Sequence, residues 1–209
     1  MSRTRVKFCG LTRPGDVRLA CELGVDVVGF VLAADSPRRV QPGQLPGLRA
    51  AVSPLVDVVA LFMNPPGSEV LDAIRRLRPS LLQFHGQEND AFCRSFGLPF
   101  LKTLPMGEGA DEPEAASRRY PSAMAFLLDG HGPGQVGGRG ISFDWDRTPR
   151  LDRPVFLAGG LGAGNVADAI TRSRPYAVDV CSGIESSPGQ KDGEKMQQFL
   201  DEVSRADRE

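Results

Sequence analysis

The sequence predicts a single (β/α)8 barrel over residues 1–209, small for its class and with some outer helices shortened or missing. Short apolar, β-rich runs recur eight times and begin about 24 residues apart on average. Helical patterns alternate with them, which implies parallel strand pairing. Two turns rich in glycine and serine follow the last two runs, as in the phosphate site that the loops after strands seven and eight form in such barrels.

The expected strands are continuous apolar runs in several cases, which is typical of strands buried on both faces. We place them at 5–9, 26–31, 55–62, 80–84, 99–103, 124–129, 154–158 and 176–181. We place helices at 14–23, 67–77, 88–96, 164–172 and 191–206, with weaker helical patterns at 42–51 and 111–120. Pro14 and Pro66 stand where helices can begin. The stretch 130–153 predicts little helix beyond one turn near Trp145.

An open, doubly wound sheet is the alternative architecture. Its nucleotide loop normally follows the first strand. Here the first strand ends in Cys9-Gly10-Leu11-Thr12, which is no phosphate loop, and the glycine turns lie at the other end of the chain. We therefore favour the closed barrel.

Composition excludes several classes of partner. The chain is 41% hydrophobic and 24% charged, like ordinary globular proteins. A net charge of −1 and a pI near 6.2 predict no nucleic-acid or membrane partner. The four cysteines form no CxxC pair, and no signal peptide or long apolar run is present. These features predict a cytoplasmic protein with reduced thiols and no structural zinc site.

Catalytic groups of such barrels lie at the C-terminal ends of the strands. The residues found there are Cys9, Gln83 with His85, Lys102, Asp129, Asp179 and Cys181. Cys9 is either a nucleophile or base with a stabilised thiolate, or a small buried filler. Asp129 follows an apolar run, so burial would raise its pKa and suit a general acid; the alternative is a loop-starting residue that accepts backbone N–H bonds.

Lys7 and Asp179 share inward parity on strands one and eight, which barrel closure makes neighbours. We predict a contact between them, because each is costly to bury alone. The contact would place positive charge one layer beneath Cys9 and favour its thiolate. For Asp179 a structural pair is favoured over direct catalysis.

The remaining polar candidates lie in loops or at one strand end. His85 is expected to be a hydrogen-bonded support and His131 to be solvated; two lone histidines without an acidic cluster make a metal site improbable. Arg38 either binds a carboxylate through two parallel hydrogen bonds of its guanidinium group or is a solvated charge in a loop. The glycine-rich segment 137–140 leads into no long helix, so we interpret it as a mobile lid rather than a nucleotide loop.

Two turns have the composition of an anion site. Gly159 and Gly160 follow one apolar run, and Ser182 and Gly183 follow the next. Glycine lets backbone N–H groups approach an anion, and a following helix start adds the positive end of its dipole.

Taken in order, these pieces resemble the phosphoribosylanthranilate isomerase family. The matching segments are KFCGLTRPGD at 7–16, GVDVVGFVLAADSPRRV at 24–40, LFMNP at 61–65, LLQFHGQE at 81–88, LLDG at 127–130, GGRGISFDW at 137–145, LAGGLGAGNVADAI at 157–170 and VDVCSGIESSPGQKD at 178–192. They span nearly the whole chain. The resemblance implies a TIM barrel with no metal or cofactor that acts in tryptophan biosynthesis.

The resemblance also implies roles for individual residues. Cys9 would be the general base, Asp129 the general acid, and Arg38 would meet the anthranilate carboxylate of the phosphorylated sugar substrate. Gln83, His85 and Asp179 are assigned to substrate binding, and the phosphate site to Gly159, Gly160, Ser182 and Gly183. The substrate would be N-(5-phosphoribosyl)anthranilate, the product 1-(2-carboxyphenylamino)-1-deoxyribulose 5-phosphate, and the protein a monomer or homodimer.

The sequence departs from the family pattern at several positions. Gly162-Ala163-Gly164 replaces the usual capped helix start, Cys181 replaces a serine, Arg139 adds a charge, and Gly130 follows the acid. Three alternatives stay open: a metal-dependent ribulose-phosphate epimerase, the histidine-pathway aminoaldose isomerase, and a catalytically silent phosphate-binding barrel. The first needs more ligands than two histidines supply, the second an aspartate in place of Cys9, and the third tolerates loss of Cys9 or Asp129.

Overall fold

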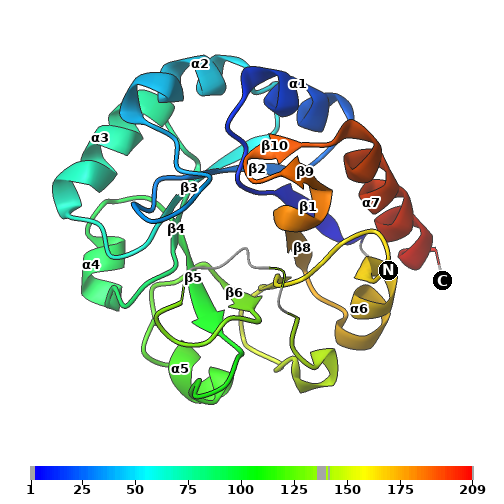
Figure 1. Cartoon of the computed structure of the whole chain (residues 1–209). Helices are drawn as coiled ribbons and strands as arrows, with labels where there is room; N and C mark the ends of the chain where they lie inside the picture. Colours follow the sequence, from blue (N-terminus) through cyan, green and yellow to red (C-terminus); the bar gives the residue numbers. More distant parts are fainter. Residues whose placement is uncertain (1–2, 136–139, 141, 209) are drawn as a thin grey trace.

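Eight parallel strands pair in chain order and close into a barrel in the computed structural model, which describes residues 3–135, 140 and 142–208. The strands are β1 (Arg5–Phe8), β2 (Val27–Val31), β3 (Asp57–Phe62), β4 (Leu81–Phe84), β5 (Phe100–Pro105), β6 (Ala125–Asp129), β7 (Val155–Leu157) and β8 (Ala177–Val180). Pairing of β1 with β8 closes the ring (Figure 1). The predicted closed barrel is confirmed, and the open sheet is wrong.

Helices surround the barrel as an outer ring (Figure 1). They are α1 (Pro14–Glu22), α2 (Leu45–Ala50), α3 (Gly67–Leu77), α4 (Asp90–Arg94), α5 (Pro113–Ser117), α6 (Val166–Ser173) and α7 (Gly193–Ala206), with 3-10 turns η1 (Pro42–Gln44), η2 (Trp145–Arg147) and η3 (Ser182–Ile184). Helices α4 and α5 have five residues each. The described residues between β6 and β7 form only the turn η2. The prediction of shortened or missing outer helices is therefore confirmed.

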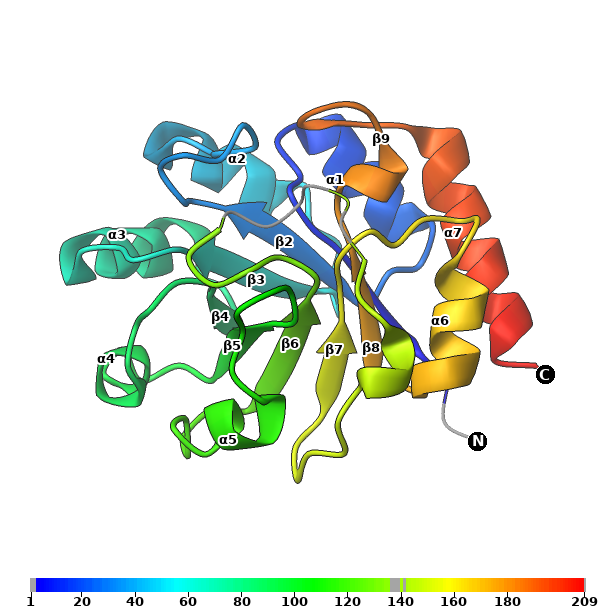
Figure 2. The ribbon, with the colours of Figure 1, turned by 60° about the horizontal axis from the view of Figure 1, so that its bottom comes forward.

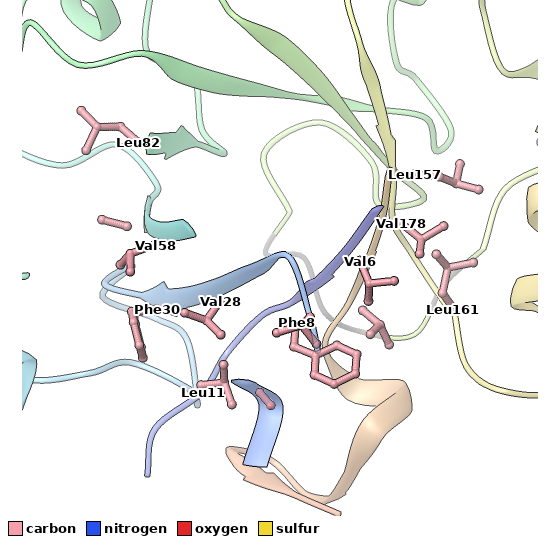
Figure 3. Packing of buried hydrophobic residues seen from close by; sticks show 14 of the residues in the cluster. Val6, Phe8, Leu11, Val28, Phe30, Val58, Leu82, Leu157, Leu161 and Val178 are labelled. Atoms are coloured by element: carbon pink, nitrogen blue, oxygen red, sulfur yellow. The ribbon is translucent and has the colours of Figure 1, made fainter. Parts of the chain in front are cut away.

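The main hydrophobic core lies between the strands and the helices. Outward-facing side chains of the strands, including Val6, Phe8, Val28 and Phe30, pack there (Figure 3). Ring contacts extend the core to the helices: Phe8 meets Phe199 of α7 edge-on at 6.0 Å. α7 lies beside α1, so elements from the two ends of the chain complete the ring (Figure 2).

A second, smaller apolar cluster fills the inside of the barrel. Its members are Leu101, Ala125, Leu127, Phe156, Ala158 and Ala177. Polar side chains that share their inward parity lie further along the strands, among them Asp129 and Asp179. Apolar side chains thus fill part of the barrel interior, and polar side chains line it toward the C-terminal mouth.

The strand and helix boundaries differ from the expected ones at a few positions. The third strand begins at Asp57 rather than at 55, because Leu55 adopts a positive φ of 66°. A short hairpin of β9 (Glu185–Ser187) and β10 (Gln190–Lys191) follows β8 and was not predicted. It turns at Pro188-Gly189, where Gly189 has φ 79°.

Three further observations concern the helices, the cysteines and the predicted lid. None of the helices in the described ranges is both long and apolar enough to cross a membrane. All four cysteines are free thiols. Most of the segment predicted to be a lid, residues 137–139, lies outside the described residues.

Candidate active site

A pocket that is partly open to solvent lies at the C-terminal mouth of the barrel. It brings together nearly all of the residues that the sequence singled out, which are Cys9, Arg38, Gln83, His85, Asp129, Gly159, Gly160, Asp179, Cys181 and Ser182. Gly183 lines an adjoining hollow that shares Gly160 and Ser182 with this pocket. Parallel strands explain the convergence, because their carboxyl ends meet at one mouth.

Cys9 follows β1 and is 3% exposed. Its backbone N–H donates to the Val180 carbonyl at 2.9 Å, which continues the β1–β8 pairing. Gly29 on β2 leaves room for the sulfur: an added Cβ there would lie 3.0 Å from Cys9 Sγ and 3.2 Å from Lys7 Nζ. The thiol and the ammonium group therefore lie together against the same glycine.

Lys7 forms the predicted contact with Asp179. Its Nζ lies 2.9 Å from Asp179 Oδ1, and the lysine side chain is fully buried. Burial opposes the charge on Lys7, but the charge and hydrogen bond of Asp179, together with Cys9 when it is a thiolate, outweigh it and hold the pKa of Lys7 above its usual range. The lysine is thus an ammonium ion inside the barrel, directly beneath the pocket.

The thiol of Cys9 feels opposing influences. Burial raises its pKa, Lys7 lowers it through its charge and a hydrogen bond, and Asp179 raises it. The net pKa lies above the ordinary value, so the unliganded protein holds mostly the thiol at neutral pH. Lys7 acts in the direction predicted from the sequence, but burial is the larger effect.

Asp129 ends β6 and is 7% exposed. Burial raises the pKa of its carboxyl group, the charge of Asp179 acts in the same direction, and His131 opposes both. Backbone hydrogen bonds from His131 and Gly130 also favour the carboxylate. Asp129 therefore combines both sequence-based interpretations: it accepts backbone N–H bonds and still holds its proton more tightly than a free aspartate.

His131 is buried, so the expectation that it is solvated is wrong. It is 3% exposed, and its ring lies over that of His85 with the centroids 4.5 Å apart. The β5–α5 loop packs over it: Gly107 donates its N–H to the His131 carbonyl, and an added Cβ at Gly107 would lie 2.7 Å from His131 C. A local sequence rich in glycine and proline carries no sign of this long-range packing.

Arg38 is buried and pairs with a residue that the sequence analysis missed. Its Nε and Nη2 donate to the two carboxylate oxygens of Glu185 at 2.8 and 2.7 Å. Lys191 Nζ donates to the same carboxylate at 2.9 Å. Burial opposes the charge on Glu185, and Arg38 and Lys191 outweigh it, so the pKa of Glu185 lies below its usual value. The hairpin β9–β10 thus fixes the arginine, and the solvated-loop interpretation is wrong.

Two other strand-end residues have different surroundings. Gln83 donates from Nε2 to Thr103 Oγ1 at 3.3 Å, and its Oε1 has no partner among the described residues. Lys102 lies outside the pocket, because its parity on β5 is outward. Its Nζ donates to the Gly86 carbonyl at 2.6 Å and to Glu88 at 3.2 Å. Lys102 therefore forms an ion pair with Glu88 of the loop between β4 and α4, outside the pocket.

The loops after β7 and β8 form the adjoining hollow. Consecutive positive φ angles at Gly159 and Gly160, 86° and 65°, turn the chain after β7. The N-cap residue of α6, Asn165, makes no capping bond; its side chain instead accepts from the Gly162 N–H and donates to the Gly160 carbonyl, each at 2.9 Å. The helix start lacks a side-chain cap, as inferred, but the reason differs: the N-cap position is Asn165 and not a glycine or alanine, and its side chain bonds elsewhere. The Val166 N–H donates to the Gly162 carbonyl at 3.0 Å instead.

Gly183 is needed because the two loops touch. A Cβ at this position would lie 2.0 Å from the Leu161 carbonyl oxygen. The contact holds the two loops together around the hollow, whose lining residues are Gly140, Gly160, Leu161, Gly162, Gly164, Asn165, Ser182 and Gly183. Uncapped N–H groups and small residues at a helix start suit a phosphate.

Comparison with known proteins gives one consistent result. Residues 6–202 match the family model described as N-(5'phosphoribosyl)anthranilate (PRA) isomerase. The N-(5'-phosphoribosyl)anthranilate isomerase of Xanthomonas oryzae pv. oryzae is 56% identical, over 98% of this chain and 95% of that protein. The solved isomerase of Thermus thermophilus is 37% identical with a TM-score of 0.86, over 97% of this chain and 99% of that one.

A third relative carries a ligand. It is a solved phosphoribosyl anthranilate isomerase in complex with reduced 1-(o-carboxyphenylamino)-1-deoxyribulose 5-phosphate, 31% identical with a TM-score of 0.81, over 97% of this chain and 99% of that one. The pocket geometry, the family model and these likenesses agree over almost the full length of the chain. This chain belongs to the N-(5'-phosphoribosyl)anthranilate isomerase family.

Proposed function

We propose that the pocket isomerises N-(5-phosphoribosyl)anthranilate to 1-(2-carboxyphenylamino)-1-deoxyribulose 5-phosphate, the Amadori-type step of tryptophan biosynthesis, with Asp129 as general acid and Cys9 as general base. The observation that carries this assignment is the convergence of a buried carboxyl group and a buried thiol on one pocket beside a hollow lined mostly by glycine and other small residues. An acid and a base on different walls suffice for this chemistry.

The acid acts first. Asp129 donates its proton to the furanose ring oxygen, the C1–O bond breaks, and the ring opens to an iminium ion. A carboxyl group whose pKa is raised by burial keeps this proton available. The positive nitrogen then makes the proton on C2 acidic.

The base acts second. Cys9 removes the C2 proton as a thiolate and leaves an enolamine, which tautomerises to the ketone. Burial holds the thiol protonated in the free protein, whereas Lys7 and the new iminium cation both favour the thiolate. Ring opening thus favours loss of the thiol proton to water at the open mouth of the pocket, and this loss generates the base that the following step needs.

Binding groups hold the two ends of the substrate. The phosphate fits the hollow between Gly160, Ser182 and Gly183, next to Gly159 and the uncapped start of α6. Arg38 also lines the pocket, where a guanidinium group suits the anthranilate carboxylate. Gln83, His85 and Asp179 line the same pocket and offer polar contacts to the sugar. These remote contacts orient the sugar between acid and base.

Turnover of phosphoribosylanthranilate, followed by the loss of anthranilate fluorescence, tests the proposal. Cys9→Ala and Asp129→Asn should each lower kcat by ~10²–10⁴-fold, and Cys9→Ser nearly as much as Cys9→Ala. Cys93→Ala is the matched control, since this buried thiol lies in the outer core and not in the pocket. A loss below tenfold for Cys9→Ala, or a parent-like kcat for Asp129→Asn, would remove that residue from its role.

A further inference from the structure

Three metal-ligating side chains converge at the inner wall of the pocket. One ligand atom each from His85, Asp129 and His131 lies within 4.8 Å of the other two, and all three residues are buried. They come from the end of β4, the end of β6 and the loop after β6. We propose that they form a binding site for a Zn²⁺-class transition-metal cation, and that the bound cation inhibits turnover by competing with substrate.

The imidazole nitrogens are available for such an ion. Three ring nitrogens have no hydrogen-bond partner among the described residues: both of His85, and Nε2 of His131. Both side chains are nevertheless more than nine-tenths buried. Buried polar atoms are nearly always satisfied, so orphaned nitrogens in one place indicate a missing partner. A cation shared by both rings would satisfy one nitrogen of each, Nε2 of His131 and one of the two of His85.

His131 is already oriented as a metal-bound histidine is. Its Nδ1 lies 2.8 Å from the Gly132 carbonyl oxygen. A carbonyl oxygen only accepts, so Nδ1 carries the hydrogen and the lone pair of the neutral ring is on Nε2. Backbone carbonyls fix the tautomer of metal-bound histidines in this way.

The donor set selects the class of metal. Two imidazoles and one carboxylate with an open fourth position are typical of accessible zinc sites, whereas Mg²⁺ and Ca²⁺ prefer oxygen donors. Ligand atoms around a tetrahedral zinc lie about 3.4 Å apart, given bonds of about 2.0–2.2 Å. The three side chains therefore need to approach one another by at most about 1.4 Å, the difference from 4.8 Å. The fourth position faces the pocket that His85 and Asp129 line.

Competition with substrate follows from the shared residue Asp129. A carboxylate that coordinates a cation cannot also donate a proton to the ring oxygen of the sugar, so the cation and the substrate cannot occupy Asp129 together. This inhibitory half of the proposal rests on the proposed function of Asp129, whereas binding of the metal does not. The two can therefore fail separately.

The full chain, freed of metal with a chelator, is titrated with Zn²⁺ by calorimetry and with Co²⁺ by absorption spectroscopy. One equivalent should bind, and bound Co²⁺ should show visible bands of a four-coordinate site without a thiolate charge-transfer band in the near ultraviolet. His131→Asn and His131→Phe should weaken binding at least tenfold. Without metal they should keep parent-like turnover, since His131 is assigned no catalytic role, and melting curves check that both fold.

Cys181→Ser is the matched control for the thiols in the pocket and should leave the Zn²⁺ affinity unchanged. In the parent, Zn²⁺ should raise the apparent KM of substrate without lowering kcat. No binding, a thiolate band, or unchanged affinity in both His131 variants would overturn the site. If the parent binds Zn²⁺ without inhibition, the inhibitory role of the site is overturned. If Asp129→Asn keeps its turnover but binds Zn²⁺ more weakly than the parent, the proposed function is refuted and the metal site stands.

Discussion

Lys7→Met is the most informative substitution in this barrel, because Lys7 links stability to the chemistry of Cys9. The Lys7 side chain is fully buried, and its ion pair with Asp179 measures 2.9 Å. Removing one partner leaves the other charge buried and unpaired, which typically costs about 3–5 kcal/mol. At about 2–4 °C per kcal/mol for a chain of this size, the melting temperature should fall by about 6–20 °C.

The same change should make the Cys9 thiol harder to ionise. Lys7 lowers the pKa of Cys9, and Asp179 raises it. Loss of the ammonium group removes the lowering influence, while the raising influence of Asp179 remains. The pKa of Cys9 should therefore move upward. An opposite charge at close range is worth about 1–3 pKa units, so the thiolate fraction at a given pH should drop by about tenfold or more.

Two measurements check this reasoning. Thermal melting gives the stability, and the alkylation rate of Cys9 against pH, read by peptide mass spectrometry to separate it from the other thiols, gives its titration. The double variant Lys7→Met/Asp179→Leu should recover most of the lost stability, because an apolar pair of similar volume replaces a buried ion pair well. A single variant that melts with the parent and leaves the Cys9 titration unmoved would refute the argument.

Three further outcomes are expected. Glu185→Gln should raise the KM of substrate with a smaller effect on kcat, because Arg38 loses the carboxylate to which it donates two hydrogen bonds at 2.7–2.8 Å. Steady-state kinetics would show this, and an unchanged KM contradicts it. Lys102→Met should destabilise the fold by about 3–5 kcal/mol in urea titrations through the unpaired Glu88, with KM unchanged. Cys181→Ser should keep turnover within a few-fold of the parent, and a loss above about tenfold would give this thiol a catalytic role.

The barrel could be predicted from sequence because its signals are local and repeated. Each strand is a short apolar run, and the glycine turns after the last two runs point to loops seven and eight. Boundaries shifted where one residue changed the backbone, as at Leu55 with its positive φ. The hairpin β9–β10 was missed because its residues are polar and its strands are only three and two residues long.

The site could be predicted where a side chain's position follows from strand parity. Lys7, Cys9, Asp129 and Asp179 all lie where alternation along their strands puts them. Lys102 also follows parity, which places it outside, and only its place near a strand end suggested otherwise. His131 and Glu185 lie in loops, and their burial depends on packing between segments distant in sequence, which no local pattern encodes.

Charge pairing along the wall of the pocket explains how an apolar barrel tolerates so many ionised groups and still attracts an anion. The ion pair of Lys7 and Asp179 balances itself. Arg38 and Lys191 share the carboxylate of Glu185, so two cations meet one anion, and one positive charge on this wall is unbalanced among the described residues that pair there. A substrate carboxylate beside Arg38 would supply the missing negative charge, and under the proposed function the phosphate would meet small residues and backbone groups in the hollow of Gly160, Ser182 and Gly183. On that proposal the two anionic ends of the substrate would meet different kinds of positive potential, and this difference would set the direction in which the sugar lies between Asp129 and Cys9.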